Sequence, residues 1–68
     1  MPGLTPEEIR AELILRKIKQ VDIARSLGVS QAAVNRVISG DSVSQKIREE
    51  IAAILGRPVA TIWPEQAA

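Results

Sequence analysis

Side chains suited to hydrogen-bonded recognition gather in one short stretch, GVSQAAVNRVISG at residues 28–40. A helix turns by about 100° per residue, so one arc of this stretch would carry small and polar side chains: Ala32, Asn35, Arg36 and Ser39. Gln31 stands at the leading edge of that arc, and the opposite arc carries Val34, Val37 and Ile38. The pattern predicts a helix that buries its β-branched side and offers its polar side to a partner.

The chain contains few of the residue types that enzymes use for catalysis. There is no cysteine and no histidine, which excludes a thiolate nucleophile, an imidazole base and a conventional zinc site. The eight carboxylates are scattered, and no glycine-rich phosphate loop is present. We therefore expect a protein that is not an enzyme, with no cofactor, no metal and no small-molecule substrate.

Length and composition predict one small globular domain over residues 1–68. The 68 residues are 46% hydrophobic and 25% charged, which is too apolar for a disordered chain. No apolar run approaches the roughly 20 residues that cross a bilayer, and no secretory signal precedes the first capping motif. The cytoplasm is the expected location.

The net charge of +1 is unevenly distributed. Residues 16–46 contain six basic and two acidic side chains, a balance of +4, whereas both ends of the chain are acidic. The middle of the chain could face a polyanion, although a solvated mixed surface explains the charges about as well.

Helical signals predict an all-α fold of four to five helices. Thr5, Pro6 and Glu8 are typical of a capped helix start, and this helix is expected to end near Lys17 to Lys19. Its buried stripe comprises Ile9, Leu13 and either Ile14 or Ile18. A second helix spans 20–27 and ends at Gly28, and a third runs from the cap Ser30 to about Ser39 and ends at Gly40.

A fourth helix should start after Ser42 or Ser44 and run through Leu55 to Gly56. Its apolar face consists of Ile47, Ile51, Ile54 and Leu55. A last short turn at 59–63 would return Ile62 and Trp63 to the core, with order ending at Pro64 and spanning about 5–64. Trp63, the only aromatic residue, is either an anchor for this turn or a subunit contact.

The segment 20–39 has the pattern of a helix-turn-helix. Ala24 is small where two helices must approach closely, Gly28 lies at the turn, and Val29 can fill the elbow. The apolar interface between the two helices would contain Ile23, Leu27, Val34 and Val37. An ordinary helical hairpin in a small bundle is the alternative interpretation.

The stretch QVDIARSLGVSQAAVNRVISG resembles the helix-turn-helix of lambda-repressor-like (Cro/CI, XRE) DNA-binding domains, and the resemblance covers nearly the whole chain. The ending KIREEIAAILGRPVATIWPE is similar to that of the small Ner-type regulators of Mu-like phages. The motif alone would also suit a LacI-type headpiece, but such headpieces begin almost directly with the motif, whereas here a capped helix precedes it.

The resemblance implies that the third helix enters the major groove of double-stranded DNA. Small Ala32 and Ala33 would let it approach the base edges, and the base-reading side would consist of Gln31, Ala32, Asn35 and Arg36. Gln20 matches a residue that contacts a phosphate and braces the recognition glutamine. Further phosphate contacts are expected from Ser30, Lys17, Lys19, Ser42, Ser44 and Lys46.

The leading functional hypothesis is a sequence-specific transcriptional regulator, specifically a phage or prophage repressor that binds an inverted-repeat operator as a homodimer. Dimeric binding is expected because Asp22 and Asp41 reduce the basic charge near the motif, so that one monomer would bind modestly. The alternative is a helix-turn-helix module that binds another protein and has no autonomous DNA binding.

Overall fold

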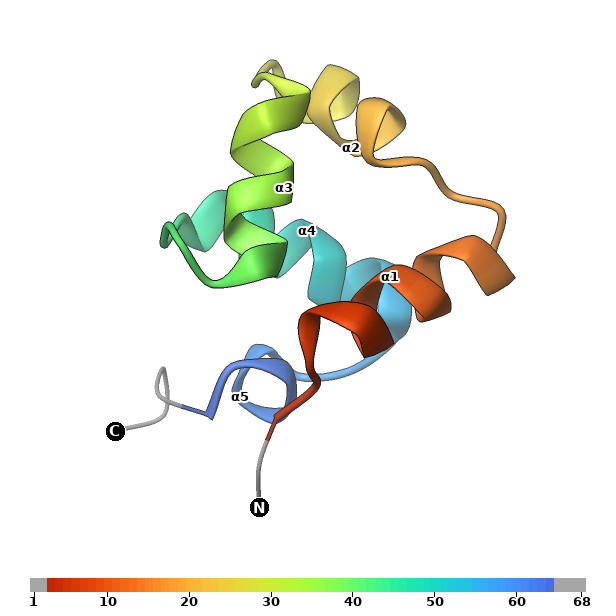
Figure 1. Ribbon diagram of the computed structural model, residues 1–68, viewed down its shortest axis with the longest axis vertical. Coiled ribbons are helices and arrows are strands. Elements are labelled where there is room, and N and C mark those ends of the chain that lie inside the picture. Colours follow the sequence, from red (N-terminus) through yellow and green to blue (C-terminus); the bar gives the residue numbers. More distant parts are fainter. Residues whose placement is uncertain (1–2, 65–68) are drawn as a thin grey trace.

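The computed structural model describes residues 3–64, and within that range helices are joined by loops and turns and no strand is present. Five helices follow one another, as Figure 1 shows: α1 (Pro6–Leu15), α2 (Gln20–Leu27), α3 (Gln31–Ser39), α4 (Gln45–Leu55) and α5 (Val59–Ile62). The all-α fold class is confirmed. The expectation that order ends at Pro64 concerns residues outside the described range.

Local capping chemistry explains where most of the helices begin. The Thr5 hydroxyl accepts from the Glu8 N–H at 3.1 Å, and the Glu8 carboxylate accepts from the Thr5 N–H at 2.8 Å, so the predicted capping box is present. Ser30 caps α3 by accepting from the Ala33 N–H at 3.0 Å. Of the two candidate serines for α4, Ser44 is the cap, because its hydroxyl accepts from the Ile47 N–H.

The predicted end of the first helix was wrong. α1 ends at Leu15, two to four residues earlier than expected, because Lys17 adopts the left-handed conformation with φ of 58°. The Ile18 N–H then bonds to the Leu13 carbonyl at 2.9 Å, which closes the helix as a Schellman-type turn. Glycine usually occupies this conformation, so no residue type in the sequence marked the turn.

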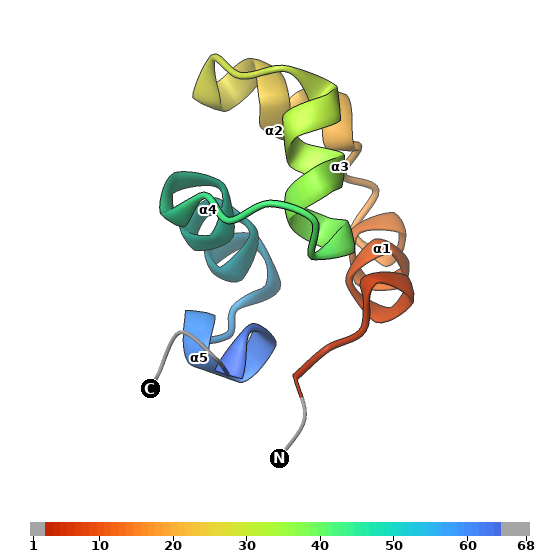
Figure 2. The same cartoon turned by 60° about the vertical axis from the view of Figure 1, so that its left-hand side comes forward.

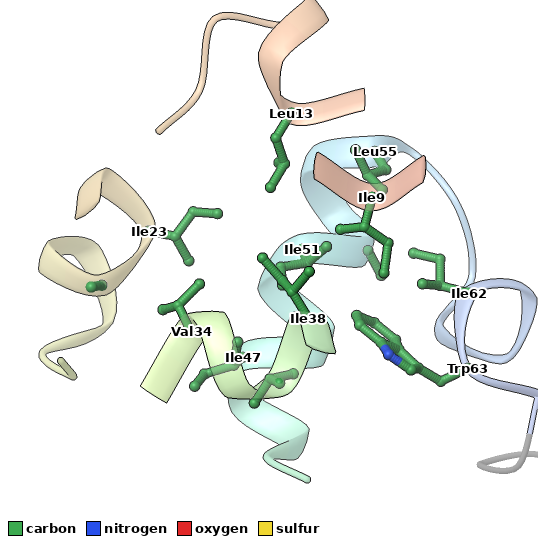
Figure 3. Packing of buried hydrophobic residues seen from close by; sticks show 13 residues of the cluster. Ile9, Leu13, Ile23, Val34, Ile38, Ile47, Ile51, Leu55, Ile62 and Trp63 are labelled. Atoms are coloured by element: carbon green, nitrogen blue, oxygen red, sulfur yellow. The ribbon is translucent and has the colours of Figure 1, made fainter. Parts of the chain in front are cut away.

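The core lies where all five helices meet (Figure 3). Its members are Ile9, Leu13, Ile23, Ala24, Val34, Val37, Ile38, Ile47, Ile51, Ala52, Leu55, Ile62 and Trp63. Ile14 is 73% exposed, and Ile18, which lies beyond the end of α1, packs partly against this cluster, so the buried residues of α1 are Ile9 and Leu13 alone. The burial of Trp63 assigns it the role of an anchor for α5.

Arg48 is a core residue that the sequence pattern did not predict. It is buried on α4, and its guanidinium carbon lies 4.9 Å from the centroid of the Trp63 ring. A guanidinium over an indole face is a favourable cation–π arrangement, and it lets a charged residue occupy the inner side of α4. The contact ties α4 to the segment that follows α5.

Candidate nucleic-acid interface

The outward side of α3 is polar and accessible along its first two turns. Gln31, Ala32, Asn35 and Arg36 are exposed. Val34, Val37 and Ile38 on the other side are each at most 1% exposed. Ala33 is intermediate and packs partly against the core. The structure thus places all four predicted base-reading residues on one open surface of a helix whose other side is fixed by packing.

The turn between α2 and α3 sets the angle at which α3 is presented. Gly28 has φ of 70°, and the Val29 N–H bonds to the Ala24 carbonyl at 3.0 Å. Ala24 is 3% exposed between the two helices, where a larger side chain would separate them. Figures 1 and 2 show α2 and α3 joined by this turn, with α3 on the outside of the molecule.

A surface hollow of about 320 Å³ separates the end of α1 from the starts of α2 and α3. It is lined by Arg10, Leu13, Ile14, Ile18, Lys19, Gln20 and Gln31. Three of the residues predicted to contact DNA, Lys19, Gln20 and Gln31, therefore line the same hollow. Within residues 3–64 the amides of Gln20 and Gln31 are not hydrogen-bonded to each other, so the bracing of Gln31 by Gln20 stays a prediction.

An arginine that sequence reasoning did not assign to this surface reaches it from α1. Arg10 Nη2 donates to Asn35 Oδ1 at 3.2 Å and to Ser39 Oγ at 2.8 Å. Figure 2 shows α1 beside the lower half of α3, which explains how the side chain spans the two helices. Arg10 is 25 residues from Asn35 in sequence, so no local pattern could have indicated the pair.

The sequence matches the helix-turn-helix family over residues 9–62, which is most of the chain. The chain belongs to this family. The match is of the lambda-repressor-like (XRE) type, whose members are DNA-binding regulators and typically not enzymes. Neither the curated proteins nor the solved structures include a match.

In this helix-turn-helix domain the other predicted contact residues lie in the connections between helices and in the first turn of α4. The hydroxyl oxygens of Ser30 and Ser44 accept capping hydrogen bonds, which leaves each hydroxyl hydrogen able to donate to an anion. Ser42 and Lys46 are exposed in the α3–α4 loop and in the first turn of α4. Lys17 and Lys19 are exposed in the α1–α2 connection.

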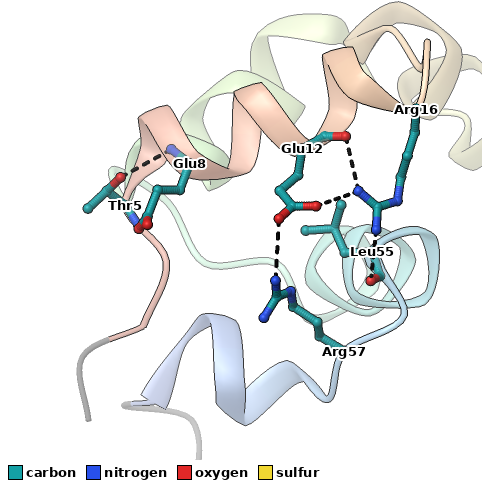
Figure 4. Close-up of polar contacts among 6 residues, drawn as sticks. All are labelled: Thr5, Glu8, Glu12, Arg16, Leu55 and Arg57. Atoms are coloured by element: carbon teal, nitrogen blue, oxygen red, sulfur yellow. Dashed lines mark hydrogen bonds and ion pairs between the residues drawn. The ribbon is translucent and has the colours of Figure 1, made fainter.

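Some basic side chains of the helix-turn-helix domain are already paired with carboxylates. Glu12 accepts from Arg16 and, at 3.3 Å, from Arg57, and Arg16 also donates to the Leu55 carbonyl (Figure 4). The hydrogen bond from Arg16, followed by the charges of both arginines, outweighs desolvation and lowers the pKa of Glu12 below its ordinary value of 4.5. This cluster joins α1 to the end of α4 and is a structural contact.

Four basic residues of the middle segment make no ion pair within the described part of the chain: Lys17, Lys19, Arg36 and Lys46. Their positive charges remain available to an anionic partner.

Across residues 3–64 there is no cluster of three metal-ligating side chains, and no helix is long and apolar enough to span a bilayer.

Proposed function

We propose that this protein is a sequence-specific regulator of transcription that inserts α3 into the major groove of double-stranded DNA. The observation that carries the proposal is the two-sided character of α3: one side is fully buried, while Gln31, Ala32, Asn35 and Arg36 are exposed together. A helix with short and medium polar side chains can approach base edges closely.

Each exposed residue has a distinct role in this proposal. Gln31 carries both a donor and an acceptor and can pair with adenine through its amide, and Arg36 can pair with guanine or bind a phosphate. Ala32 contributes by being small. Asn35 lies one turn beyond Gln31 and contacts the next part of the groove.

The DNA backbone would be held on both sides of α3. Lys19 and Gln20 share a hollow with Gln31, and Lys17 lies two residues before Lys19. Ser30 lies at the start of α3, and on the other side Ser42, Ser44 and Lys46 precede or begin α4. These donors would fix the register of α3, while the base edges would supply the sequence preference.

The finer part of the proposal is a phage or prophage repressor that occupies its operator as a dimer. The four cations of residues 16–46 that make no ion pair among the described residues would support modest affinity for a single site, so two copies on an inverted repeat, about 10 base pairs between half-site centres, would be needed. The similarity of the C-terminal segment to Ner-type regulators supports the phage assignment. Such a repressor would be a single-domain protein that acts in the bacterial cytoplasm, on the nucleoid.

The test is selection of bound duplexes from a random DNA pool at near-physiological salt, followed by affinity measurements on the selected site. An inverted repeat should be enriched. Gln31→Ala and Arg36→Ala should each reduce the binding free energy by about 1–3 kcal/mol without changing the melting temperature. Arg25→Ala is the matched control, because Arg25 is an exposed arginine on α2 that pairs with Asp22 at 3.8 Å.

Two exposed apolar residues favour a second candidate, a module that binds another protein. Ile14 and Leu15, at the end of α1, are 73% and 78% exposed. Salt separates the candidates, since phosphate contacts make DNA affinity fall steeply with ionic strength and an apolar interface is far less sensitive. Recovery of no DNA motif by the folded protein would refute autonomous DNA reading and favour the module.

A further inference from the structure

The contact between Arg10 and α3 restricts how Asn35 can meet a partner. One guanidinium nitrogen, Nη2, makes both of its hydrogen bonds to α3, at 3.2 Å to Asn35 Oδ1 and at 2.8 Å to Ser39 Oγ. Asn35 and Ser39 are four residues apart and therefore neighbours on the same side of the helix. The side-chain oxygens of Asn35 and Ser39 on α3 thus both bind the Arg10 guanidinium, which comes from α1.

The chemistry of the pair determines the orientation of the amide. A guanidinium has only donors, so the amide atom that faces Arg10 must be the oxygen. The amide is planar, and its NH2 group therefore points away from Arg10. Because Asn35 is exposed, the surface of α3 offers two N–H donors at this position, while the amide oxygen is turned toward Arg10, which occupies one of its two lone pairs.

We propose that Arg10 is a positioning residue that makes Asn35 a hydrogen-bond donor toward DNA, so that Asn35 selects a base with acceptors in the major groove and disfavours adenine. This inference rests on the proposed function. Recognition of adenine by an amide needs the oxygen for the N6 amino group as well as the NH2 group for N7. Guanine, with O6 and N7, and thymine, with O4, need donors alone.

Gln31 provides the internal contrast. Its side chain makes no hydrogen bond within residues 3–64, so both its donor and its acceptor remain available to adenine. The recognition helix therefore carries two amides with different preferences, and the difference comes from a residue outside the helix-turn-helix.

Selection from random duplexes tests this assignment with three proteins: the wild type, Asn35→Ala and Arg10→Met. The position whose preference disappears in Asn35→Ala is the one that Asn35 contacts. In the wild type this position should be guanine or thymine, preferred over adenine by about fivefold, the worth of one hydrogen bond. In Arg10→Met the amide can rotate, and adenine should become as frequent as guanine at this position alone.

Ser39→Ala tests the same restraint without altering charge. It removes the 2.8 Å anchor of Arg10 and should shift the preference in the same direction by a smaller factor. Arg25→Met and Ser26→Ala are the matched controls, because they remove an exposed arginine and an exposed serine from α2. Both should leave the base preference unchanged, and melting curves should show that all variants are folded.

Three outcomes would overturn the inference while leaving the proposed function intact: adenine opposite Asn35 in the wild type, an unchanged preference in Arg10→Met, or a loss of affinity in Asn35→Ala that is equal for all sequences. The last result would mean that the donors of Asn35 contact a phosphate oxygen. If the wild type selects no motif, the proposed function fails, and this inference fails with it.

Discussion

Lys17 combines a conformational cost with an exposed charge, and the two can be separated by mutation. Its φ of 58° is unfavourable for any residue with a Cβ, by about 1–2 kcal/mol. Glycine removes that cost but gains about 0.4–1 kcal/mol of freedom in the unfolded chain. Lys17→Gly should therefore stabilise the domain by about 0.5–1 kcal/mol, a rise in melting temperature of roughly 2–8 °C at this size.

Lys17→Ala is the matched variant, since it removes the charge but keeps the Cβ. Its melting temperature, followed by circular dichroism, should stay close to that of the wild type. If Lys17 binds a phosphate, both variants should lose DNA affinity equally for all sequences, and the slope of log affinity against log salt should fall by about one. A lower melting temperature for Lys17→Gly would refute the conformational argument, and unchanged salt slopes in both variants would refute the phosphate contact.

Three further predictions concern the fold. The pKa of Glu12 is lowered, chiefly by its hydrogen bond with Arg16, so its contribution to stability is complete above the ordinary pKa of 4.5 and is lost as the pH falls through the lowered value. Glu12→Gln should accordingly be less stable than the wild type in denaturant titrations at neutral pH, with the difference disappearing in acid. Gly28→Ala should cost about 1 kcal/mol through its φ of 70° alone, since a Cβ there meets nothing within 4 Å. Gly3→Ala should cost more in the same titrations, because a Cβ there would lie 2.2 Å from the Ile62 carbonyl oxygen.

Features of the fold that depend on neighbouring residues were predictable from the sequence. The capping box at Thr5, the left-handed Gly28 and the serine cap of α3 each result from chemistry within about four residues. The apolar periodicity also placed the core side of α3 correctly. For the same reason the end of α1 was wrong: Lys17 takes a glycine conformation, and nothing in its side chain indicates that.

Contacts between distant segments were not predictable. Arg48 looks like a surface residue of α4 until Trp63 covers it, and that arrangement depends on how α5 folds back. Arg10 looks like a solvated residue of α1 until α3 brings Asn35 and Ser39 to it. In both cases the sequence supplies the residue types, but only the packing of helices decides which partners meet.

The distribution of charge explains why the orientation of one amide could matter. Arg16 is bound to Glu12 and Arg25 lies near Asp22, so two of the six basic side chains of residues 16–46 are paired within the fold and four remain for a partner. A surface with few free cations gains little affinity from phosphates, and its discrimination must come from base contacts. A side chain that is already held in its binding orientation loses less conformational entropy on association than a free one. The restraint of Asn35 by Arg10 would therefore improve the specificity of DNA binding without adding charge. A small and nearly neutral domain can improve its specificity in this way.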